Sequence, residues 1–83
     1  MSNDNEAVTD PRLVEPLVER IKPILAGNPG QIQGAVLADL LAIFLAGHAP
    51  PLREQILAIH LETVRRLIPV NEAMIFPNGR PWD

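Results

Sequence analysis

The chain has no cysteine among its 83 residues, so no disulfide bond can stabilise its fold. Metal binding is also disfavoured, because the only two histidines, His48 and His60, lie far apart in the sequence without the partners of a zinc motif. The length suits one domain, and a domain this short buries only about 60–65% of its unfolded surface. Stability must therefore come from good helix packing or from oligomerisation.

Aromatic residues are scarce, at 4% of the chain, and basic residues do not exceed acidic ones, since the net charge is −3. The hydrophobic 47% consists mainly of Leu, Ile, Val and Ala, a composition that suits helices. An acidic chain is a poor partner for nucleic acids, whose phosphates require a basic face, and for anionic lipid surfaces. We expect no nucleic-acid partner and no cofactor.

Long hydrophobic runs are missing as well. The longest apolar stretch, residues 36–46, is interrupted by Asp39 and is far shorter than the ~20 residues needed to cross a bilayer. Residues 1–9 are polar and acidic, unlike a signal peptide, and we expect them to form a disordered tail. The sequence thus favours a cytoplasmic protein with no membrane partner.

Prolines are plentiful instead, nine in all, and the first of them marks a helix start. Asp10 is a good N-cap and Pro11 suits the first helical position, which predicts a helix over about residues 11–26. At about 100° per residue, the internal prolines Pro16 and Pro23 fall opposite the apolar face. We favour one bent helix over two short helices broken near Pro16. The apolar face consists of Leu13, Val14, Leu17, Val18, Ile21, Ile24 and Leu25.

A second helix is expected over about residues 29–46. Gly27 suits a left-handed C-cap for the preceding helix, Asn28-Pro29 repeats the start signal, and Gly47 ends the new helix. Its apolar residues cover well over half of the circumference, more than two flanking helices of the same chain can cover. They are Ile32, Val36, Leu37, Leu40, Leu41, Ile43, Phe44 and Leu45.

A third helix is expected over about residues 51–68, with Pro69 as its stop. The short loop at residues 47–50 predicts that it runs antiparallel to the second helix. Residues 70–75 then add one short helical turn capped by Asn71.

The remaining residues, 76–83, predict an irregular, turn-rich tail with a tight turn at Asn78-Gly79. We expect Phe76 to fold back over the core. The sequence leaves open whether Trp82 does the same or is captured by a partner.

Together these patterns predict an all-α protein: an antiparallel three-helix bundle with the apolar helix 29–46 in the middle. Residues 10–75 would form a single helical domain between the two tails.

The second helix also carries small residues at every fourth position, which form one ridge of its surface. A ridge of this kind allows close approach of another helix. Three settings remain open: a contact within the subunit, a contact between subunits, or an alanine-rich solvent face. The residues are Gly30, Gly34, Ala38, Ala42 and Ala46.

Asp39 is the lone charge in the apolar run of the second helix, and His60 lies within the apolar arc of the third. Arg53 precedes His60 by one heptad. In an antiparallel hairpin, a polar contact of Asp39 with His60 or Arg53 is geometrically possible, and it would be structural or, less plausibly, functional. Unrelated rim positions are the alternative. Glu62 is also spaced to pair with Arg65 or Arg66.

The apolar faces of the three helices are wider than the helices can cover among themselves. We therefore expect a protein-interaction module that self-associates, as a homodimer, through its apolar helix faces. One alternative is an adaptor that binds a different protein through an apolar groove or its C-terminal tail. Another is a small-ligand or enzymatic role around Asp39 and His60. We expect no enzyme, because no nucleophile accompanies this pair. The interface candidates are Gly34, Ala38, Ala42, Leu37, Leu40, Leu41, Phe44 and Leu45.

Overall fold

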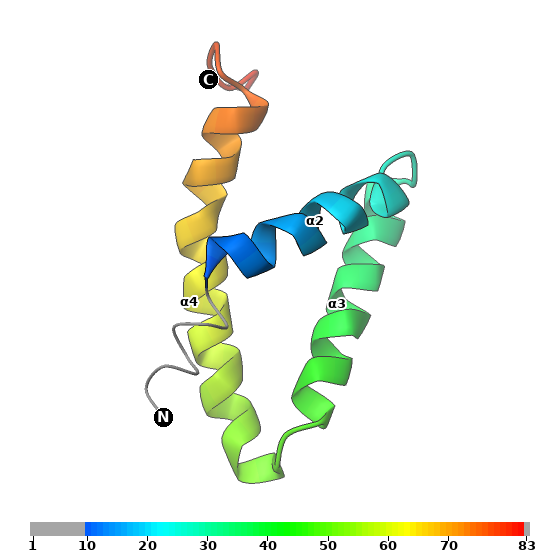
Figure 1. Ribbon diagram of the computed structural model, residues 1–83, viewed down its shortest axis with the longest axis vertical. Coiled ribbons are helices and arrows are strands. Elements are labelled where there is room, and N and C mark those ends of the chain that lie inside the picture. Colours follow the sequence, from blue (N-terminus) through cyan, green and yellow to red (C-terminus); the bar gives the residue numbers. More distant parts are fainter. Residues whose placement is uncertain (1–9, 83) are drawn as a thin grey trace. The chain divides into compact units, whose positions relative to one another are not determined.

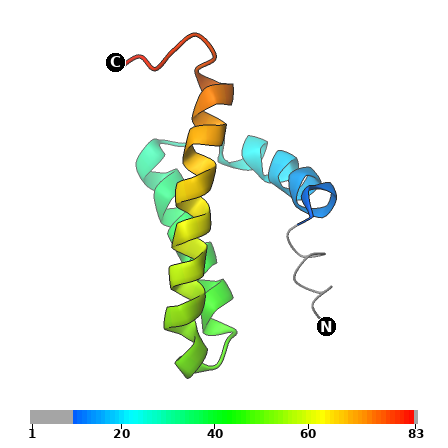
Figure 2. The same cartoon turned by 90° about the vertical axis from the view of Figure 1, so that its left-hand side faces the viewer.

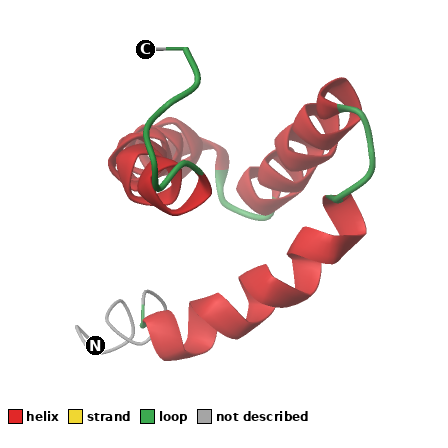
Figure 3. Cartoon of the chain, turned by 90° about the horizontal axis from the view of Figure 1, so that it is seen from above, coloured by secondary structure: helices red, strands yellow, loops and turns green. Residues whose placement is uncertain are grey.

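The computed structural model describes residues 10–82, and this part of the chain holds three helices and no strand. The helices are α2 (Pro11–Leu25), α3 (Gly30–Ala46) and α4 (Pro50–Ile75), joined by short loops (Figure 1, Figure 3). The all-α prediction is confirmed, and three helices with α3 and α4 in contact agree with a three-helix bundle. The prediction for residues 1–9 falls outside the described residues.

Helix α2 begins where the cap signal predicts. The Asp10 carboxylate accepts a hydrogen bond from the backbone N–H of Arg12 at 2.9 Å, and Pro11 occupies the first turn. The Arg12 guanidinium also donates to Asp10, at 2.6 to 3.2 Å. The bonds from the Arg12 side chain, and to a lesser extent the bond from its backbone N–H, lower the pKa of the Asp10 carboxyl below its ordinary value. The acid thus keeps its charge, which the helix N-terminus favours.

Both internal prolines are accommodated within α2, which runs unbroken through Pro16 and Pro23. The prediction of one helix is confirmed over two short ones. A proline removes one N–H from the hydrogen-bond ladder. Because both prolines share the polar side of α2, the carbonyl groups that lose their donors lie on the side away from the apolar stripe.

The junction between α2 and α3 follows one prediction and departs from another. Gly27 adopts a positive φ of 88° just after α2, as the C-cap signal predicts. The expectation that Asn28 caps the start of α3 is wrong, because its side-chain amide donates backward to the carbonyls of Ile24 and Leu25, at 3.2 and 3.1 Å. The amide therefore satisfies carbonyls at the end of α2, and the Pro29 carbonyl accepts the first bonds of α3.

The chain reverses direction after α3 in a short loop, residues 47–49, so that the end of α3 and the start of α4 run antiparallel (Figure 1, Figure 2). This arrangement is the one predicted from the loop length.

The predicted end of the third helix at Ile68 is wrong, because α4 continues without a break to Ile75. Pro69 lies inside the helix, and Asn71 does not cap a new turn: its side-chain amide donates to the Leu67 carbonyl at 2.9 Å. Proline removes one ladder bond, and α4 continues through this position although the flanking residues, Ile68 and Val70, are not strong helix formers. The apolar spacing continues on both sides of Pro69 and outweighs the cost of this proline to the helix.

The chain divides into two compact units, one up to Ala38 and the other from Asp39 onward, so that the boundary lies inside α3. The first unit contains α2 and the first half of α3. The second contains the rest of α3, α4 and the tail. A single domain over residues 10–75 stays a prediction.

Candidate interaction surface

Exposed apolar side chains dominate the surface, and no residue of the described part of the chain is buried. Within the second unit, the half-buried apolar side chains of α3 and α4 lie near the loop that joins the two helices. They are Leu41, Leu45, Ile56 and Leu57. The α3–α4 hairpin thus buries one narrow strip and leaves most of its apolar side chains in contact with water.

The predicted interface residues of α3 are largely exposed. Leu37, Leu40 and Phe44 leave 53%, 50% and 48% of their surfaces accessible. Leu41 and Leu45 are half-buried. The apolar stripe of α2 is exposed as well, with Leu13 and Leu17 each at 56%. Exposed patches of large apolar residues are typical of surfaces that bind another protein.

The small-residue ridge of α3 is open along its length. Ala38 and Ala42 are exposed, and a Cβ atom added at Gly34 would meet no atom within 4 Å. Of the three settings that the sequence leaves open, a close contact within the first unit is absent at Gly34. The three settings otherwise stay open.

The hairpin loop is closed by Arg53, which lies in the first turn of α4. Its Nε donates to the His48 carbonyl at 3.0 Å and its Nη2 to the Ala46 carbonyl at 3.1 Å. These carbonyls lie at or just beyond the end of α3, where no helical N–H follows to satisfy them. Arg53 therefore supplies the C-terminal cap that the residues of α3 lack.

Of the settings left open for Asp39, the polar contact with His60 or Arg53 is not formed. Within residues 10–82, no hydrogen bond or ion pair joins Asp39 to His60 or Arg53, since Arg53 donates to the loop carbonyls. The group beside His60 is the ring of Phe44, at a centroid distance of 5.9 Å. Glu62 pairs with neither Arg65 nor Arg66, because the three ion pairs seen in this part of the chain involve other residues.

Phe44 is the centre of a small aromatic cluster at the hairpin. Its ring meets the ring of His48 edge to face, with centroids 4.8 Å apart. His48 Nδ1 donates to the Phe44 carbonyl at 2.8 Å, since a carbonyl oxygen can only accept. His60 itself is exposed, and its ring lies near Phe44 on the opposite helix.

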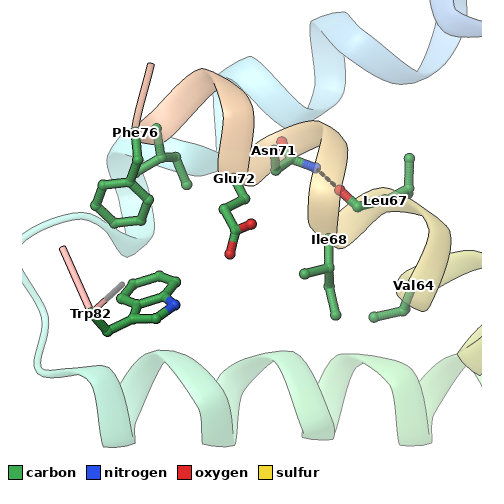
Figure 4. A pocket seen from close by; sticks show the side chains of 8 residues that line it. Val64, Leu67, Ile68, Asn71, Glu72, Phe76 and Trp82 are labelled. Carbon is green, nitrogen blue, oxygen red and sulfur yellow. Dashed lines mark hydrogen bonds between the residues drawn. The ribbon is translucent and has the colours of Figure 1, made fainter. Parts of the chain in front are cut away.

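A shallow groove of about 390 Å³ lies along the C-terminal half of α4 (Figure 4). Its lining is mostly apolar, with the Asn71 amide and the Glu72 carboxylate as polar groups. The lining residues are Val64, Leu67, Ile68, Asn71, Glu72, Ile75, Phe76 and Trp82.

The tail forms one wall of this groove. Phe76 and Trp82 meet edge to face with ring centroids 5.2 Å apart, and Arg80 pairs with Glu72 at 3.4 Å. A tight turn, in which Gly79 has a φ of 107° and its N–H donates to the Phe76 carbonyl at 3.1 Å, reverses the chain between them. The turn-rich tail and the Asn78-Gly79 turn were predicted correctly.

The sequence interpretation missed this groove because it ended the helix at Ile68. The signal was present in the spacing of Val64, Ile68 and Ile75, which keeps one helical face apolar on both sides of Pro69.

Two other site classes find no support in residues 10–82. No group of three or more His, Asp or Glu side chains is arranged to hold a metal ion there. No helix in this range is both long enough and apolar enough to span a membrane.

Comparison with known proteins gives no relative to guide the interpretation. No family model, no curated protein and no solved structure matches this chain.

Proposed function

We propose that this chain is a protein-interaction module that self-associates through the apolar faces of its helices. The observation that carries the proposal is that no described side chain is buried, whereas Leu37, Leu40 and Phe44 of α3 each leave about half of their surface exposed. Covering such faces with a second copy is the most common solution among soluble proteins.

The energetics favour association. Ordering the backbone costs about 1–2 kcal/mol per residue, and burial of apolar surface is the main term that offsets this cost. A lone copy that buries no side chain completely leaves a large part of that term unrealised. In proteins, most of the stability of a helix comes from packing of its apolar face. Contact with a second copy would supply the missing burial.

Helix α3 contributes most to this argument. From Gly34 to Ala46 its only polar side chain is Asp39, so it has no wide polar face to turn toward water. A helix that is apolar all round is usually surrounded by other protein. The α3–α4 hairpin encloses only one strip of it, where Leu41 and Leu45 are half-buried.

The test is the mass of the full chain in solution, by light scattering and sedimentation at tens of micromolar. The proposal predicts at least two chains per particle. A Leu40→Glu variant should shift the population toward monomer, because the charge would have to be buried in the interface. Gln55→Glu is the matched control, since Gln55 is an exposed polar residue of α4, and it should leave the mass unchanged.

A stable, folded monomer at this concentration would contradict the proposal. The same apolar faces would then be candidates for a different protein, as in the adaptor alternative. Self-association that survives Leu40→Glu would keep the function but move the interface away from this part of α3. Within the proposal the chain acts in the cytoplasm and carries out no chemistry of its own.

A further inference from the structure

Helix α4 carries a heptad pattern that extends through Pro69. Apolar residues and one asparagine alternate at spacings of four and three, which is the a/d pattern of helices that pack by knobs into holes. Pro69 lies outside this row, so its missing N–H does not interrupt it. The row consists of Leu57, Leu61, Val64, Ile68, Asn71 and Ile75.

The groove on α4 coincides with the second half of this row. Val64, Ile68, Asn71 and Ile75 line it, and Leu67 and Glu72 lie at the flanking positions. Leu61, Ile68 and Ile75 leave 41%, 56% and 66% of their surfaces exposed. A groove whose lining repeats every three and four residues along one helix has the shape that a second helix fits.

We propose that the occupant of this groove is α4 of a second copy, packed antiparallel along residues 64–75. The inference rests on the proposed self-association and identifies one of its contact surfaces. In this register Val64 lies opposite Ile75 of the second copy, and Ile68 opposite its Asn71. Two-fold symmetry repeats both contacts.

Charge complementarity selects this register and direction. Arg65 and Glu72 occupy the same flank of the row, one heptad apart. In the antiparallel pair each Arg65 faces Glu72 of the second copy, which gives two symmetric ion pairs. A shift by one heptad toward the N-terminus would bring the two Arg65 side chains together, and a parallel pair would bring Arg65 opposite His60. Both of these arrangements place cationic or potentially cationic groups together.

The partners of these side chains within the chain leave room for this contact. Arg65 forms no hydrogen bond or ion pair within residues 10–82. Glu72 meets only the Nη1 atom of Arg80, at 3.4 Å, and a carboxylate accepts several donors. The Asn71 amide N–H donates to Leu67, which leaves its carbonyl oxygen as an acceptor in the row.

The test uses charge reversal at both flanking positions of the full chain. Arg65→Glu alone and Glu72→Arg alone should each raise the dimer dissociation constant roughly tenfold, because each replaces two ion pairs by two repulsions. An equimolar mixture of the two variants should associate more tightly than either alone, since glutamate at 65 then faces arginine at 72 in one contact and the native Arg65 faces the native Glu72 in the other. This recovery cannot come from chains that fail to fold.

Arg66→Glu is the matched control, because it makes the same change one residue away on the outer side of α4, and it should leave association at the wild-type level. Two results would overturn the inference while self-association stands: an Arg65→Glu effect no larger than that of Arg66→Glu, or no recovery on mixing. A wild-type chain that sediments as a monomer would instead remove the proposed function on which the inference rests.

Discussion

Arg53 makes contacts that its position in the sequence does not predict. The sequence pattern groups it with Asp39 and His60, and the structure instead directs its guanidinium to the carbonyls of Ala46 and His48. The reason is local, because the unsatisfied carbonyls at the end of α3 lie within reach and their dipole favours a cation.

Replacing Arg53 should therefore weaken the hairpin. We expect Arg53→Ala to lower the free energy of unfolding by about 1–2 kcal/mol, because two charge-assisted hydrogen bonds are lost. Arg53→Lys should recover only part of this loss, since an ammonium group cannot reproduce the planar fork. Urea unfolding followed by circular dichroism measures both. Arg66→Ala, which removes an exposed arginine, is the control, and an equal effect there would contradict the role of Arg53.

A substitution at Gly34 tests whether the small-residue ridge of α3 is a close contact between subunits. Because an added Cβ would meet no atom, Gly34→Ala should stabilise α3 by about 1 kcal/mol through helix propensity alone. Thermal unfolding and the mass in solution, measured on the same samples, check this. If the variant instead lost stability and self-association together, the ridge would be a close contact between subunits.

At the scale of the elements, α4 shows where sequence reasoning succeeds and where it fails. The cap at Asp10, the left-handed Gly27 and the antiparallel loop after α3 were predictable because each depends on a few neighbouring residues. The end of α4 was not, because the cost of Pro69 is outweighed by apolar spacing over a longer stretch. The groove was missed with it, and of the settings left open for Asp39 the polar contact is not formed, since Arg53 donates to the carbonyls of His48 and Ala46.

Pro69 gives a direct test of the continuous helix. Pro69→Ala restores an N–H to the ladder and should stabilise the protein by roughly 2 kcal/mol, after allowing for the greater entropy of the unfolded chain. Urea unfolding at fixed protein concentration measures the change.

Pro51→Ala is the control, because Pro51 lies in the first turn of α4, where the missing N–H has no helical partner. Equal effects at the two positions would mean that the helix does not continue through residue 69.

At the scale of the whole molecule, helix formation and association should be one process. No described side chain is fully buried, so a dissociated chain leaves much of its apolar surface in water and offsets less of the entropy of ordering three helices. Obligate oligomers of this kind often have no stable folded monomer, and their stability depends on protein concentration.

The most direct measurement is helicity against concentration, with circular dichroism and sedimentation equilibrium followed on the same dilution series. The account predicts that the helical signal falls as the chains dissociate, with a common midpoint for the two curves. A dissociated chain that keeps its full helical signal and still unfolds cooperatively in urea would contradict it.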